Sequence, residues 1–161
     1  MDFYYNAITD IENIIKILSE LKDNIKLDYL EKEYNRKLAN AVHSILDYID
    51  KVDKNIKDNL TDDEKDLIKG FRYINNQLKP DVYIKLICQK GYGSMYPYGY
   101  PYDYGPPSVT WYNFEDNSSK YSKNNRKYYD KLFVGRSIVD SFWKIKKIIE
   151  NIEKIKNEVK K

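Results

Sequence analysis

The fold is decided in residues 61–80, which read TDDEKDLIKGFRYINNQLKP. Thr61 and Glu64 form a capping box, because the hydroxyl can accept from the Glu64 amide while the carboxylate reaches back to Thr61. Inward-facing apolar residues follow at helical spacing: Leu67, Ile68, Phe71, Ile74 and Leu78. Pro80 ends the pattern, since a proline drives the preceding residue out of the α region. The stretch therefore predicts a helix over residues 62–79.

Similar apolar stripes run through the chain on both sides of this helix. One covers residues 3–25 and a longer one covers residues 28–58. A last stripe covers residues 124–160, and it narrows beyond Ile149, so its end is expected to project from the bundle or to pair with another chain. We predict a single domain over residues 1–161 that is mainly α, an up-down bundle of four helices.

Residues 81–118 are expected to form a small β-like insertion between the third and fourth helices. Residues 82–88 and 108–114 are rich in β-branched and aromatic residues, and they could pair as a hairpin. Residues 91–107 hold four of the six glycines and four of the five prolines, a composition that excludes regular structure. We call residues 91–107 the tyrosine loop.

Tyrosines occupy every second position from residue 96 to residue 104 of this loop: Tyr96, Tyr98, Tyr100, Tyr102 and Tyr104. In an extended path their rings share one face, which could contact a protein partner or stack on unpaired bases. The alternative is that the rings fold down and cap the bundle. Trp111 is a further candidate for partner binding. No Arg or Lys lies between Lys90 and Lys120, which weakens the nucleic-acid reading because phosphate neutralisation supplies most affinity.

Charge is divided unevenly along the chain, whose net charge is +3. Residues 119–161 hold 13 basic and 5 acidic residues, whereas residues 1–118 hold 15 basic and 20 acidic residues. A basic tail of this kind can attract RNA, DNA or an acidic partner. It can equally be a solvated helix face that docks on an acidic face within the same fold.

The residues that usually carry metal, redox or acid–base chemistry are few. Cys88 is the sole cysteine and His43 the sole histidine, so no disulfide or zinc site is expected. His43 borders an apolar stripe, and no nearby nucleophile or orienting carboxylate identifies a catalytic role. The carboxylates of residues 62–66 are explained by helix capping and the helix dipole. We therefore expect no catalytic residue, no metal and no cofactor.

The N-terminal residues lack the features of a secretory signal. No run approaches the roughly 18 apolar residues of a membrane span. The sequence predicts a cytoplasmic protein without a membrane partner.

Residues 70–80 resemble the end of the signature helix of HEPN-type helical domains, which often reads aromatic-Arg-Tyr-Ala-(Arg/Asn)-Asn-x-x-Lys-His. The likeness continues more loosely through Trp111 and residues 128–139. HEPN domains occur in bacterial defence and toxin–antitoxin systems, where active members are metal-independent ribonucleases that use Arg and His, commonly on paired subunits. Here Asn75 stands at the family's arginine and Pro80 at its histidine. The resemblance therefore implies a member without catalytic activity.

These observations favour a non-enzymatic HEPN-like binding or adaptor protein of a bacterial defence or toxin–antitoxin system. Its partner would be another protein or a second copy of the chain, as in a dimer. One alternative is an RNA-binding or residual ribonuclease domain that uses Arg72, Asn75 and Asn76 for phosphate, with basic residues of the last helix. Another is a phage or structural accessory protein.

Overall fold

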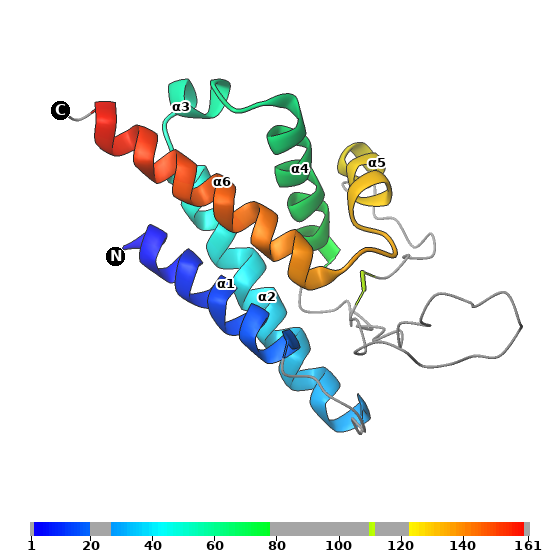
Figure 1. Ribbon diagram of the computed structural model, residues 1–161. Coiled ribbons are helices and arrows are strands. Elements are labelled where there is room, and N and C mark those ends of the chain that lie inside the picture. Colours follow the sequence, from blue (N-terminus) through cyan, green and yellow to red (C-terminus); the bar gives the residue numbers. More distant parts are fainter. Residues whose placement is uncertain (1, 20–26, 78–109, 112–122, 160–161) are drawn as a thin grey trace, which may run out of the picture.

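The computed structural model describes residues 2–19, 27–77, 110–111 and 123–159. These residues form six helices (Figure 1): α1 Phe3–Ser19, α2 Leu27–Lys51, α3 Lys54–Asp58, α4 Asp62–Gln77, α5 Lys123–Leu132 and α6 Ile138–Val159. The mainly α fold is confirmed for this part of the chain. Six helices stand in place of the four that were expected. None of them is long and apolar enough to cross a membrane, in the residues that the structure describes.

The start of α4 confirms the capping box. The Glu64 amide donates to Thr61 Oγ1 at 3.3 Å, and the Thr61 amide donates to Glu64 Oε2 at 2.8 Å. The acidic residues of this first turn also face the positive end of the helix dipole. The helix begins at Asp62, where the sequence placed it.

The helix expected over residues 28–58 is divided in two, which corrects the sequence prediction. It ends at Lys51, and Asp53 then takes an extended backbone with φ −57° and ψ 143° before α3 begins. This change of direction brings Ile56 and Leu60 into the core, where both are buried. The apolar spacing continued across the break, so periodicity concealed it.

The helix expected over residues 124–160 is likewise broken, between α5 and α6. Gly135 has φ +70°, the left-handed region that glycine enters without steric cost. Its amide donates to the Trp111 carbonyl at 3.1 Å, and the Trp111 amide donates to the Arg136 carbonyl at 3.0 Å. Residues 110–111 thus pair with the α5–α6 corner, which we define as residues 133–137. The predicted pairing with residues 82–88, and the rest of the insertion, lie outside the described residues.

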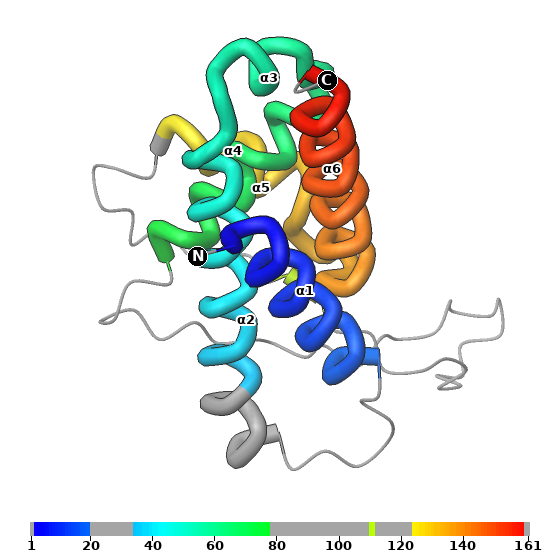
Figure 2. The backbone as a smooth tube through the Cα atoms, turned by 90° about the vertical axis from the view of Figure 1, so that its left-hand side faces the viewer, coloured from blue at the N-terminus to red at the C-terminus, as the bar shows by residue number. Residues whose placement is uncertain are grey.

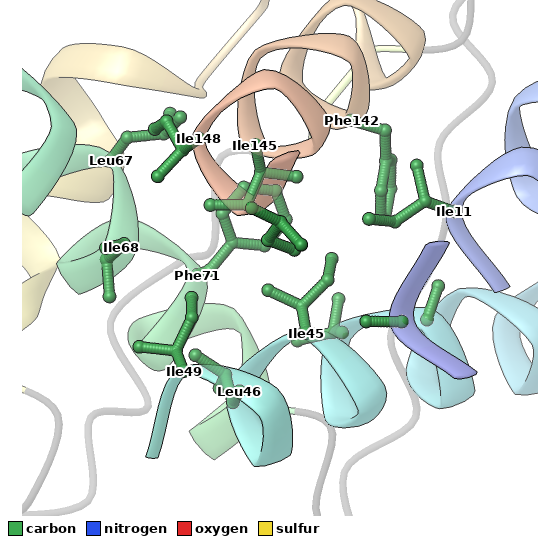
Figure 3. Packing of buried hydrophobic residues seen from close by; sticks show 14 of the residues in the cluster. Ile11, Ile45, Leu46, Ile49, Leu67, Ile68, Phe71, Phe142, Ile145 and Ile148 are labelled. Carbon is green, nitrogen blue, oxygen red and sulfur yellow. The ribbon is translucent and has the colours of Figure 1, made fainter. Parts of the chain in front are cut away.

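One hydrophobic core joins the described helices. Figure 3 shows five of its fully buried residues gathered together: Ile11 of α1, Ile45 of α2, Phe71 of α4, and Phe142 and Ile145 of α6. Helix α1 packs on α2 and α6, while α5 packs on α4. Figure 2 shows α1 and α6 side by side, with the end of α6 near α3.

Candidate functional site

Arg72, the predicted phosphate-binding residue, lies on the outer face of α4 and forms an ion pair with Asp50 of α2. Its Nη2 lies 2.5 Å from Asp50 Oδ1 and its Nη1 lies 3.4 Å from Oδ2. The two side chains are 37% and 55% exposed, so the pair lies at the surface where α2 meets α4. The Asp50 carboxylate neutralises the guanidinium charge that a phosphate would otherwise meet.

Asn75 and Asn76 lie near the end of α4, one turn beyond Arg72. Residues three and four apart are neighbours on a helix, so the structure brings the three predicted residues onto one face. Both asparagines are half-buried. Pro80 lies outside the described residues.

The side of α2 that carries Asp50 also carries His43, the sole histidine of the sequence. His43, Asp47 and Asp50 are exposed, and spacings of four and three residues place them on one side of the helix. Helices α2 and α4 run in roughly opposite directions, as Figure 1 shows. Asp50 contacts Arg72 of α4, and Asp47 lies one turn before Asp50 on the same side of α2. Sequence reasoning missed Asp50, because the contact joins residues that are 22 positions apart.

Trp111 is buried, which does not fit the partner-contact role predicted for it. It is 5% exposed, and its indole Nε1 donates to Ser141 Oγ at 2.9 Å. Its ring packs against Phe133 at 5.5 Å and stacks with Phe142 at 6.1 Å between centroids. Trp111 thus fixes residues 110–111 to the α5–α6 corner. The tyrosines at positions 96, 98, 100, 102 and 104 lie outside the described residues.

Lys69 of α4 and Tyr128 of α5 form a basic and aromatic contact between the two helices. Lys69 Nζ donates to Tyr128 Oη and to Asp66 Oδ1, each at 3.2 Å. The ammonium groups of Lys69 and Lys127 lie 4.4 and 4.9 Å from the centroid of the Tyr128 ring. The hydrogen bond from Lys69 lowers the pKa of Tyr128, because it favours the phenolate. The feature of the sequence that indicated this surface was the excess of basic over acidic residues in residues 119–161.

A pocket of about 460 Å³ opens where the start of α1 meets the end of α2 and the distal half of α6. Tyr48 donates from its hydroxyl to Glu153 Oε2 at 2.8 Å, and Lys156 Nζ donates to the same oxygen at 2.8 Å. Burial raises the pKa of Tyr48 far above its ordinary value, and the hydrogen bond to Glu153 adds to this effect. Three of the polar residues that line this pocket, Tyr48, Glu153 and Lys156, bond to one another, and the lining indicates no particular ligand.

Among the residues that the structure describes, no three His, Cys, Asp or Glu side chains are grouped so as to hold a metal ion. Comparisons of the chain with protein families, with characterised proteins and with solved structures find no match.

Proposed function

We propose that this chain is a non-enzymatic, HEPN-like binding or adaptor protein. The observation that carries the proposal is the ion pair of Arg72 with Asp50. A guanidinium that binds phosphate acts through its positive charge. Here a carboxylate already neutralises it, and Asp47 adds a second negative charge on the same face of α2. This surface disfavours a phosphate backbone and suits a structural contact.

The substitutions seen in the sequence support the same proposal. If the HEPN resemblance holds, Asn75 and Pro80 replace the two residues that would perform the acid–base step. An amide and a pyrrolidine ring carry no proton to exchange near neutral pH. A defence or toxin–antitoxin setting is the one that the resemblance suggests.

The tyrosine loop is the segment that we propose contacts the protein partner. Trp111 supports this role, because it anchors the chain to the α5–α6 corner seven residues after Tyr104. A segment that is anchored near one end loses less conformational freedom when it binds. Tyrosine rings supply a large contact area at low entropic cost.

Incubation of the purified protein with total RNA tests the non-enzymatic part of the proposal. We expect no cleavage above that of a mock purification, and no difference between the wild type, Arg72→Ala and Asp50→Ala. Asp50→Ala is the informative control, because it leaves Arg72 in place and removes its partner. Cleavage by the wild type that is lost in Arg72→Ala would overturn the proposal.

Capture of a partner from cells that produce the protein tests the role of the loop. We expect association that survives high salt and is lost when the five alternating tyrosines of the loop become serine. The matched control is Tyr5→Ser, which changes a tyrosine that is 66% exposed on α1. Association that the loop variant retains would contradict the role of the loop.

A further inference from the structure

Helix α5 has a basic face. The surface around Arg72 differs, because a carboxylate there pairs with the guanidinium. Its ten residues include four basic residues and one acidic residue. Lys127 and Lys131 are four residues apart, so their side chains are neighbours on one face of the helix. Lys127 and Lys131 are exposed. Neither forms an ion pair with a carboxylate in the part of the chain that the structure describes.

Lys69 extends this face from α5 onto α4. Its ammonium group lies against the Tyr128 ring and donates to the phenol, so the two helices present their charges together. Arg126 lies on another side of α5, because adjacent residues of a helix point about 100° apart, and its Nε lies 3.5 Å from Asp130 Oδ2. We define the α5 basic face as Lys69, Lys127 and Lys131. Most of the positive charge that this face offers to a partner comes from Lys127 and Lys131.

We propose that the α5 basic face binds a short acidic segment of a protein partner. Charge complementarity is the basis for this occupant. Helix α5 is about 15 Å long, at 1.5 Å per residue. An extended peptide of about five residues spans that length at roughly 3.3 Å per residue. A few carboxylates can therefore meet the exposed lysines at once.

The geometry favours an acidic peptide over single-stranded nucleic acid. Affinity for single strands normally comes from aromatic rings on which bases stack, joined to a groove that follows many phosphates. The aromatic ring at this face is Tyr128, and two ammonium groups already lie within 5 Å of its centroid. The ring therefore has less surface to offer to a base, while the ammonium groups remain suited to carboxylates.

This site includes no residue of the tyrosine loop, and it rests on the proposed function only in that the partner is a protein. Fluorescence anisotropy with two labelled probes tests it: a pentaglutamate peptide and an oligoadenylate of the same length. The variant Lys127→Glu/Lys131→Glu reverses the exposed charges. The control Lys147→Glu/Lys154→Glu makes the same change in net charge at exposed positions of α6. Circular dichroism checks that both variants stay folded.

We expect the wild type and the α6 control to bind the peptide, with affinity that falls as salt rises. The α5 variant should bind it at least about tenfold more weakly, because its new carboxylates repel the peptide. An equal loss in both variants would overturn the proposal, as it would report net charge alone. The proposal would also be overturned if the wild type did not bind the peptide, or if it bound the oligoadenylate more tightly than the peptide. A loop variant with serines should retain peptide binding, so failure of either proposal leaves the other testable.

Discussion

At the scale of single residues, Gly70 allows the α5–α6 corner to rest on the backbone of α4. A Cβ at this position would lie 2.1 Å from Cε2 of Phe133, far inside contact distance. The ring is fully buried and packs edge-on against Phe71 at 5.1 Å between centroids, so its neighbours hold it in place. The absence of a side chain at Gly70 is therefore a packing requirement.

Gly70→Ala is expected to destabilise the protein by about 1–3 kcal/mol, the usual cost of overpacking a core. A loss of stability would be informative, because alanine in a helix interior is normally more stable than glycine by about 1 kcal/mol. Urea unfolding of the variant and the wild type measures the difference. In the double variant Gly70→Ala/Phe133→Ala the two losses should be less than additive, since the clash is gone. A more stable Gly70→Ala variant would show that the ring moves freely.

At the scale of elements, the sequence predicts features that depend on neighbouring residues and misses those that depend on distant ones. The capping box at Thr61 was predictable because both partners lie within one helical turn. The ion pair of Arg72 with Asp50 was not, since it depends on how α2 meets α4. The burial of Trp111 was not predictable for the same reason: it depends on Ser141 and on the aromatic rings of other helices.

The break between α5 and α6 illustrates how periodicity can conceal a corner. Leu132 and Ile138 both continue the apolar stripe, which is why one helix was predicted. Gly135 was the local sign of a break, but a glycine within a helical pattern is ambiguous. The pairing of the corner with Trp111 resolves the ambiguity, and that contact joins residues 24 positions apart.

Gly135→Ala tests whether backbone conformation maintains this corner. Among the described residues, no atom beyond the two chain neighbours lies within 4 Å of a Cβ built there, so the prediction rests on backbone conformation. We expect a loss of about 1–2 kcal/mol, because a left-handed backbone is unfavourable for residues with a Cβ. Gly135→Asn should lose less, since asparagine tolerates this region better. Thermal unfolding compares the variants, and an alanine variant as stable as the wild type would contradict the argument.

At the scale of the whole molecule, the basic C-terminal segment is partly docked on the acidic N-terminal one. Lys146 Nζ of α6 lies 2.8 Å from Glu12 Oε1 of α1, a contact of opposite charges between the two segments. Near the other end of α6, the Tyr48 hydroxyl of α2 donates to Glu153. Polar contacts thus join α6 to both helices of the first pair, beside the shared apolar core.

Two buried phenols link the stability of the whole molecule to alkaline pH. Burial raises the pKa of Tyr48 and of Tyr129 well above the ordinary value of about 10, and these rings are 2% and 1% exposed. The unfolded chain releases both protons near pH 10, while the folded chain retains them. Their contribution is fully present below pH 10 and is lost as pH rises further. Tyr128, whose pKa is lowered, acts in the opposite direction.

The free energy of unfolding should therefore fall above about pH 10, by at most about 1.4 kcal/mol per pH unit for each phenol. Lys69 and Lys146, whose pKa values are raised by hydrogen bonds, contribute in the same direction. Urea unfolding of Tyr48→Phe across this range isolates one phenol. At neutral pH the free energy of unfolding of this variant should be lower than that of the wild type by about 1 kcal/mol, because the hydrogen bond to Glu153 is lost. Above pH 10 its stability should fall less steeply than that of the wild type. Tyr5→Phe should keep the wild-type slope, because that ring is exposed. If Tyr48→Phe kept that slope as well, the phenol at the junction of α2 and α6 would ionise as freely in the folded protein as in water.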